Sequence, residues 1–276
     1  MTPSFEESSP ASQERPTAID TSIAHTARVW NYWLGGQDNY PVDHEVGDQI
    51  RAIMPDIVDT ARADRGFLGR AVRYLTTEAG IRQFLDIGTG LPTANNTHEV
   101  AQAVAPECRI VYVDNDPLVL VHARALLTST PQGATDYIQA DIRDADSILR
   151  KASRSLDFTR PLALMLLGIV NFIVDNDEAH AVVNRLLDAL PSGSYLVLSH
   201  PTTEVDAEAA LEVQRLWNER ATPPVRFRSR QELMGFFDRL ELLEPGVVSC
   251  CRWRPDPFQL GGLVEDQGFG GVGRKP

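Results

Sequence analysis

The spacing of hydrophobic residues along the chain changes in kind near Gly80. Before that point, apolar and aromatic side chains recur every three or four positions, which is typical of amphipathic helices. This spacing predicts a helix over residues 26–34 that ends at Gly35-Gly36, and a second helix between Asp43 and Pro55. A third and longer helix is predicted over about residues 58–77.

After Gly80, short apolar runs typical of strands alternate with helical stretches. Capping residues such as Asp116-Pro117, Asp175-x-x-Glu178 and Ser229-x-x-Glu232 mark several of the helix starts. Five strands are predicted at 83–88, 109–114, 135–141, 161–167 and 194–200, and helices at 118–127, 175–190, 206–220 and 229–240. This order predicts an α/β fold with a doubly wound, mostly parallel sheet.

The composition of the chain suggests three segments. Residues 1–20 are rich in Ser, Pro, Thr and Glu and have little to bury, so we expect a disordered arm. Residues 21–80 form an N-terminal helical extension in this interpretation, and residues 81–276 form the α/β domain. The glycine-rich end, residues 268–273, is either a frayed tail or a last edge strand.

Charge and cysteine content narrow the possible partners and the compartment. The chain has 26 basic and 38 acidic residues, a net charge of −12, which disfavours nucleic acid and anionic membranes as partners. Three cysteines are too few for a disulfide framework and are not spaced as a metal pair, so we expect no metal site. With no signal peptide visible and no apolar run long enough to cross a bilayer, we expect a cytoplasmic protein.

Acidic residues and glycines follow the predicted strands at the edge where such sheets bind ligands. They are Asp86 with Gly88 and Gly90, then Asp114, then Asp141, and Gly168 after the fourth strand. The Gly-x-Gly pair permits a tight turn and close approach of a ligand, or it is only a strand-to-helix turn.

Asp114 indicates a ligand site more specifically than Asp141 does. Asp114 can accept hydrogen bonds from both ribose hydroxyls of a nucleoside, because Asp116 before Pro117 is the better helix cap. Asp141 could accept from the exocyclic amine of a base. The alternative for Asp141 is a solvated turn, because Asp144 and Asp146 continue an acidic loop.

The turn after the first strand favours one class of nucleoside. It reads Gly88-Thr-Gly-Leu-Pro-Thr93 and lacks the third glycine of the dinucleotide motif, while Asp86 puts a negative charge near the phosphate position. S-adenosylmethionine has no phosphate and carries a sulfonium and an ammonium, which carboxylates attract. The charges therefore favour S-adenosylmethionine over NAD.

The segment Arg28-Val-Trp-Asn-Tyr-Trp-Leu-Gly-Gly-Gln-Asp-Asn-Tyr40 gathers aromatic and polar residues around a glycine joint. We expect Trp30 and Trp33 to dock the helix on the core. Our hypothesis for the others is a lid over the cofactor that also shapes the acceptor pocket. Its residues would be Tyr32, Gly35, Gly36, Asp38, Asn39 and Tyr40.

One histidine is a candidate general base. His200 ends the fifth predicted strand at the ligand edge, and a base is needed only if the acceptor is a weak acid such as a hydroxyl. The alternative is a structural histidine whose ring nitrogens are already hydrogen-bonded.

Three blocks resemble an actinobacterial family of S-adenosylmethionine-dependent methyltransferases, long catalogued as a domain of unknown function. They are Phe84-Leu-Asp-Ile-Gly-Thr-Gly-Leu-Pro-Thr93, Val111-Tyr-Val-Asp-Asn-Asp-Pro117 and Gly35-Gly-Gln-Asp-Asn-Tyr40. The resemblance, which runs from about Ile23 to Pro276, implies the Rossmann-like class I methyltransferase fold, with seven strands of which the glycine-rich last one is antiparallel.

The resemblance also implies roles for particular residues. Asp86, Gly88 and Gly90 would line the methionine end of the cofactor, Asp114 the ribose, and Asn115, Asp141 and Ile142 the adenine. The chain departs from the wider pattern at Pro92, where a third glycine is usual, and from the family at Asn171, where histidine is frequent.

Taken together, these features predict a methyltransferase that moves a methyl group from S-adenosylmethionine to an unidentified small molecule. A protein that binds the cofactor without turnover, and an NAD-dependent oxidoreductase, are the alternatives.

Overall fold

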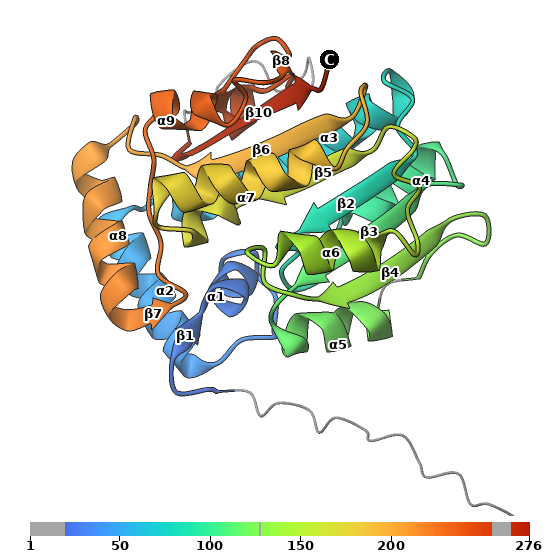
Figure 1. Cartoon of the computed structure of the whole chain (residues 1–276). Helices are drawn as coiled ribbons and strands as arrows, with labels where there is room; N and C mark the ends of the chain where they lie inside the picture. Colours follow the sequence, from blue (N-terminus) through green and yellow to red (C-terminus); the bar gives the residue numbers. More distant parts are fainter. Residues whose placement is uncertain (1–19, 127, 256–265) are drawn as a thin grey trace, which may run out of the picture.

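A computed structural model of the chain describes residues 20–126, 128–255 and 266–276. Its centre is a twisted sheet in the order β4-β3-β2-β5-β6-β10-β8, with β9 (Val248–Ser249) paired to β10 (Figure 1). The bounds are β2 Gln83–Ile87, β3 Arg109–Asp114, β4 Ala134–Gln139, β5 Ala163–Leu167, β6 Tyr195–Pro201, β8 Glu241–Leu242 and β10 Gly268–Arg274. Strands β2 to β6 are parallel, and β10 is antiparallel to β6.

The predicted fold class is confirmed, including the antiparallel glycine-rich strand, although the sheet has eight strands among the described residues rather than the seven expected, because the short β8 and β9 both pair with β10. That strand is neither a frayed tail nor an edge, because β10 lies between β6 and β8. Its glycines let helices pack closely: a Cβ on Gly270 would lie 2.7 Å from the Phe67 ring, and one on Gly273 would lie 2.8 Å from Phe237.

Helices cover both faces of the sheet, which explains the nearly continuous apolar strands. Along β3, Val111 and Val113 pack in one hydrophobic cluster while Ile110 and Tyr112 pack in the cluster on the opposite face. The first cluster includes α6 (Ala145–Ala152), α7 (Asn176–Asp188) and α9 (Arg230–Gly235). The second includes α3 (Ile57–Thr77) and α4 (Thr97–Val104).

The helix starts follow the capping residues closely. Asp175 accepts from the Glu178 amide at 2.8 Å at the start of α7, and Ser229 caps α9, which is shorter than predicted. α5 (Pro117–Leu126) begins at the predicted proline. The sequence analysis missed α4 and α6, and the interpretation of Asp144 as loop was wrong, because its carboxylate accepts from the Ser147 amide and caps α6.

The N-terminal segment packs beside the carboxyl end of the sheet rather than apart from it. β1 (Ala24–His25) pairs with β7 (Ala221–Thr222), and α1 (Thr26–Trp33) and α2 (Pro41–Ile53) share a core with α8 (Ala207–Arg220). Trp33 docks there as predicted, at 8% exposure. The boundary at residue 80 stays a prediction, and the expected disordered arm lies, except for Asp20, outside the described residues.

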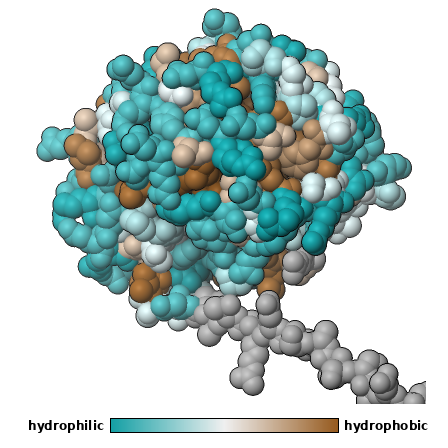
Figure 2. All heavy atoms as spheres, viewed as in Figure 1, coloured by the Kyte–Doolittle hydropathy of each residue, from teal (hydrophilic) through white to brown (hydrophobic). Residues whose placement is uncertain are grey.

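The face shown in Figure 2 is mostly hydrophilic, with hydrophobic residues in separate patches. Among the residues that the structure describes, the exposed large apolar side chains are scattered, for example Val121, Leu211 and Met234. No helix in these ranges combines the length and apolarity that a membrane crossing requires.

Candidate functional site

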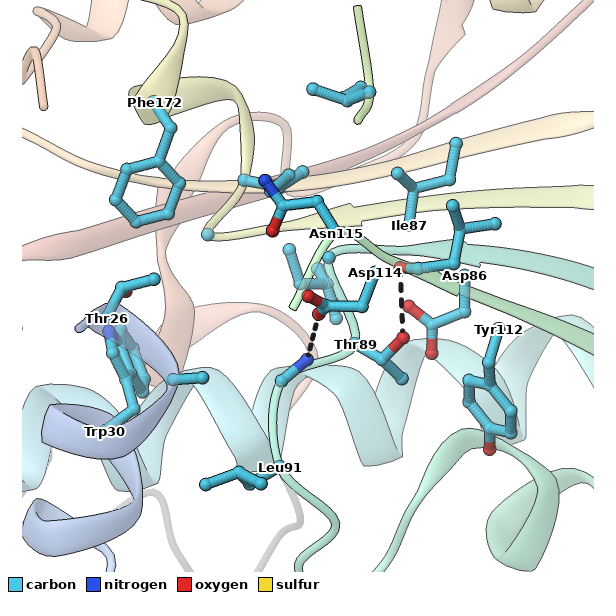
Figure 3. A pocket seen from close by; sticks show the side chains of 18 of the residues that line it. Thr26, Trp30, Asp86, Ile87, Thr89, Leu91, Tyr112, Asp114, Asn115 and Phe172 are labelled. Carbon is cyan, nitrogen blue, oxygen red and sulfur yellow. Dashed lines mark hydrogen bonds between the residues drawn. The ribbon is translucent and has the colours of Figure 1, made fainter. Parts of the chain in front are cut away.

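A cavity of about 160 Å³ opens at the carboxyl ends of β2, β3 and β5, where the strand order reverses. Because four aspartates line it (Asp64, Asp86, Asp114 and Asp141), we call it the carboxylate cavity. All eight residues that we predicted to bind the cofactor lie in its wall: Asp86, Gly88, Gly90, Asp114, Asn115, Asp141, Ile142 and Gly168. Figure 3 shows the Asp86 and Asp114 carboxyl groups on the sheet side, with Thr26 and Trp30 of α1 across from them.

The glycine turns have the backbone conformation that their sequence indicated. Gly88, Gly90 and Gly168 have φ of +80°, +66° and +58°, a region that L side chains rarely adopt. A Cβ on Gly88 would also lie 2.7 Å from the Ile169 side chain, whereas the space beside Gly90 and Gly168 is open. Glycine at 88 is therefore required by packing, and glycine at 90 leaves room beside the backbone.

Asp86 is buried at the end of β2, with 4% exposure. The Thr97 hydroxyl, at the first turn of α4, donates to its Oδ2 at 2.6 Å. The pKa of Asp86 is raised to about 6, with burial as the largest cause; the Asp114 and Asp64 charges act in the same direction, and Thr97 and the Arg65 charge oppose the shift. The site thus keeps a carboxylate where its charge is poorly solvated.

Asp114 holds the turns of two neighbouring strands together. Its Oδ2 accepts from the Gly90 amide at 2.9 Å and its Oδ1 accepts from the Asp116 amide at 2.9 Å (Figure 3 shows the first bond). Burial raises its pKa to about 6. Each carboxylate oxygen has a second lone pair, so Asp114 can still accept from a ligand. Asp116 caps α5 through the Leu118 amide, as the sequence indicated.

Asp141 is the most exposed of the four carboxylates and the only one with a direct ion pair among the described residues. Arg143 lies 3.3 Å from its Oδ1 and also pairs with Glu178 at 3.2 Å. Arg143 further donates to the Phe172 carbonyl at 2.7 Å, which ties the turn after β4 to the turn after β5. Most of the charge of Asp141 is therefore compensated within the protein.

The predicted lid residues do not line the cavity themselves. Tyr32 donates to Asp48 at 2.8 Å and stacks on His44, and Tyr40 lies under the Arg28 guanidinium. Gly35, Gly36, Asp38 and Asn39 are also absent from the described wall. The structure therefore does not bring these six residues into the wall of the carboxylate cavity, and their role as a lid that shapes the acceptor pocket stays a prediction.

The segment acts on the cavity through Asn31 instead. The Asn31 Oδ1 accepts from the Asp38 amide at 2.9 Å and from the Asn39 side chain at 2.7 Å, and Asn31 lines the cavity. Gly36 is needed for this packing, because its Cβ would lie 2.2 Å from the Asn31 amide nitrogen. On the other side of the segment, Asp38 lies 3.6 Å from His122 of α5.

The sequence analysis missed two wall residues that carry a readable signal. Trp30 packs against the N-terminal core as predicted, but it also lines the cavity, which the sequence did not indicate. Asp64 falls between Ala61 and Leu68 on the apolar stripe of α3, and a carboxylate in such a stripe indicates a polar cavity beneath it.

A second cavity, of about 80 Å³, adjoins the first, and we call it the apolar cavity. Thr26, Trp30, Asp64, Gly168 and Phe172 line both. The rest of its wall is mainly aliphatic and aromatic, with a few polar side chains near β6 and β10. These residues include Trp33, Ile50, Met54, Val213, Trp217, Phe227, Asn171, Ser199, His200 and Gln267.

His200 lies in this second wall, but its ring has no free nitrogen. Nε2 is 2.9 Å from the Arg228 guanidinium, which donates, and Nδ1 is 2.7 Å from the Pro201 carbonyl, so Nδ1 carries the proton. Burial lowers the pKa of His200 to about 3. A neutral ring with both nitrogens occupied cannot take a proton, so the structure contradicts His200 as general base and supports the structural alternative.

Comparisons with known proteins agree with this geometry. A family model described as S-adenosyl methyltransferase matches residues 12–276. A DUF574 family protein from Streptomyces avermitilis is 48% identical, with a TM-score of 0.90 over 94% of this chain and 100% of that one. A candidate methyltransferase from Thermobifida fusca is 41% identical, with a TM-score of 0.84 over 93% and 96% of the two chains.

More distant structures share the fold alone. Mitomycin 7-O-methyltransferase is 14% identical, with a TM-score of 0.52 over 86% of this chain and 69% of that one. No curated protein sequence matches the chain.

Proposed function

The chain belongs to the S-adenosyl methyltransferase family, and from this premise we propose that it binds S-adenosylmethionine in the carboxylate cavity and transfers the methyl group to a small molecule. The reaction is a direct displacement in which the acceptor approaches in line with the sulfonium methyl, and holding the two together supplies much of the rate.

One observation carries the choice of ligand: the cavity holds more negative charge than its own arginines neutralise, because four aspartates share its wall with Arg65 and Arg143. Asp64, Asp86 and Asp114 all have pKa values raised to about 6, with burial as the largest cause. A ligand with a sulfonium and an ammonium would relieve this cost, whereas a pyrophosphate would add to it. The methyl donor therefore fits the site better than NAD.

The arrangement of the wall supports a specific orientation. The adenosine would lie toward β3 and β4, with Asp114 accepting from the ribose hydroxyls, Asp141 from the adenine amine, and Asn115 and Ile142 beside the ring. The methionine end would lie toward β2 and β5, near Asp86 and the turns at Gly88, Gly90 and Gly168. This places the methyl group near the wall shared with the apolar cavity.

We retain a lid in modified form. In this proposal, α1 closes over the cofactor, with Trp30 and Asn31 as its contacting residues. The block at Gly35, Gly36, Asp38 and Asn39 positions Asn31. The buried thiols of Cys108 and Cys250, which form no disulfide, support a reducing compartment, so we place the activity in the cytoplasm. The acidic net charge supports a small molecule rather than nucleic acid as acceptor.

A crystal structure with S-adenosylhomocysteine bound tests the assignment. We expect the ribose hydroxyls within hydrogen-bond distance of Asp114 and the sulfur near Gly168 and Trp30. Density for the nucleoside outside the carboxylate cavity, or the reverse orientation with the adenine at Asp86, would contradict it.

A further inference from the structure

The wall of the apolar cavity contains oxygens with no partner. Among the described residues, Asn171 Oδ1 and Gln267 Oε1 make no hydrogen bond, although the two side chains are only 5% and 9% exposed. A buried acceptor without a donor costs about 1–3 kcal/mol. An otherwise apolar cavity with such acceptors in its wall favours a ligand with an apolar body and at least one O–H or N–H group.

A single carboxylate lines this cavity within the described ranges, and it lies at the junction of the two cavities. Asp64, half-buried on α3, borders both spaces together with Trp30 and Phe172. A methyl donor in the carboxylate cavity and an acceptor in the apolar cavity would meet at this junction. Asp64 is therefore placed beside the point where the acceptor atom would be attacked.

The other titratable group of this wall, His200, cannot accept the proton of an acceptor hydroxyl. His200 is held by Arg228 and by the Pro201 carbonyl, so it has no lone pair to offer. Asp64 is the remaining group of the apolar cavity, among the residues described, that can take a proton.

On the basis of the proposed function, we propose that the apolar cavity binds the methyl acceptor, a ring-sized apolar molecule with a hydroxyl group, and that Asp64 accepts the hydroxyl proton. The hydroxyl oxygen forms a bond to the methyl carbon while the carbon–sulfur bond breaks and its electron pair returns to sulfur. The hydroxyl proton moves to Asp64, so the sulfonium becomes a neutral thioether and the carboxylate becomes a carboxylic acid.

The surroundings of Asp64 suit a base that works near neutral pH. Its pKa is raised to about 6, with burial as the largest cause; the Asp266 charge acts in the same direction, and the adjacent Arg65 opposes the shift. Asp86 also couples to it across the carboxylate cavity, and the Cys250 thiol lies 4.0 Å from its Oδ1. Neutral His200 adds no charge.

Binding of matched probes tests this assignment without knowledge of the natural acceptor. We would titrate the full chain with 2-naphthol and with naphthalene between about pH 4 and 8 (about two units to either side of the Asp64 pKa). We expect 2-naphthol to bind about tenfold more tightly than naphthalene above pH 7, because the Asp64 carboxylate accepts its O–H. Below pH 5 this preference should fall to about threefold or less, because protonated Asp64 is a weaker acceptor.

Two variants locate the effect. Asp64→Asn should abolish the pH dependence of 2-naphthol binding and leave naphthalene binding within about twofold, because the shape of the cavity is kept. Val213→Phe fills the cavity from α8 and should abolish binding of both probes. Equal affinity for the two probes, 2-naphthol binding that survives Val213→Phe, or no binding of either probe would overturn the inference.

A titration with S-adenosylmethionine in the same buffer separates this inference from the proposed function. If S-adenosylmethionine does not bind, the proposed function fails. If it binds while 2-naphthol shows no preference over naphthalene, only the acceptor class and the role of Asp64 are wrong.

Discussion

The carboxylate cavity and the apolar cavity share five residues, yet the rest of each wall comes from a different part of the chain. Turns that follow β2, β3, β4 and β5 build most of the first. Helices α1, α2, α3 and α8, together with the end of β6, build most of the second. The first concentrates charge, and the second is largely aromatic and aliphatic.

This difference separates two tasks that one fold must perform. The sheet edge fixes backbone turns and carboxylates rigidly, which suits recognition of a cofactor that does not change. Helices packed over that edge can be altered without disturbing the sheet, which suits recognition of a substrate that differs between proteins. Changes in one wall should therefore leave ligand binding in the other wall intact, except at the shared residues.

The strongest test of this separation is Asp114→Asn. The variant removes a charge and turns an amide hydrogen toward the Gly90 or Asp116 amide, which are both donors. We expect the Kd for S-adenosylmethionine, measured by calorimetry, to rise about 100-fold, since losing a charged acceptor costs about 1.5–3 kcal/mol. Asp141→Asn is the matched control and should raise it about threefold or less, because Arg143 already compensates Asp141. Similar effects of the two variants would contradict the assigned roles.

The second-largest expected effect is a weakening of S-adenosylmethionine binding at acid pH. The pKa values of Asp86 and Asp114 are raised to about 6, so lowering the pH from 7.5 to 5 protonates both and removes the charges that attract the sulfonium and ammonium. We expect the Kd for S-adenosylmethionine to rise about tenfold for each carboxylate. A Kd that is unchanged between these pH values would argue against the electrostatic account.

The same change of pH should have the opposite effect on the stability of the ligand-free protein: acid should raise its free energy of unfolding. A carboxylate whose pKa is raised in the folded state stabilises the fold when protonated, and this stability is lost as the pH rises through 6. Asp86→Asn removes that dependence. We expect the variant to gain up to about 3 kcal/mol of unfolding free energy at pH 7.5, by chemical denaturation, and to gain little at pH 4.

A smaller effect is expected from Gly36→Ala in the N-terminal segment. The added methyl group would displace Asn31, so we expect the Kd for S-adenosylmethionine to rise about tenfold, equivalent to about 1.4 kcal/mol. Gly69→Ala on α3 has open space around its Cβ and is the control. Unchanged affinity in Gly36→Ala would show that the segment does not support the cofactor site.

The smallest expected effect tests the apolar wall. Val213→Phe should change the Kd for S-adenosylmethionine by less than about twofold, because Val213 borders only the apolar cavity of the two. A rise comparable to that in Gly36→Ala would show that the two walls are coupled and that the division of tasks is wrong.

The sheet and its ligand edge could be predicted from the sequence because the signals there are local. Apolar runs ending in Asp86-x-Gly88 and Asp114 mark strand ends directly, and a parallel sheet brings strand ends together. The position of β10 between β6 and β8 could not be predicted in the same way. Its glycines read as a loop or tail until Phe67 and Phe237 are seen to occupy the space beside them.

The apolar cavity could not be predicted from the sequence, because it is built by contacts between residues that are distant along the chain. His200 looked available from its place at a strand end, and only the approach of Arg228, which is 28 residues away, shows that it is not. The regular amphipathic pattern of the helix over residues 58–77 predicts a structural role, and it obscures the one carboxylate on its apolar stripe, Asp64. The sequence draws attention to the segment after Gly35-Gly36, but it does not show that Asn31, which accepts hydrogen bonds from Asp38 and Asn39, is the residue that lines the cavity.

Calorimetric titration of the wild-type chain with S-adenosylmethionine and, separately, with NADH tests the central claim most directly. The account predicts one site for S-adenosylmethionine with a Kd of about 1–100 μM and no measurable heat from NADH. Binding of NADH as tight as that of S-adenosylmethionine, or no binding of S-adenosylmethionine, would contradict it.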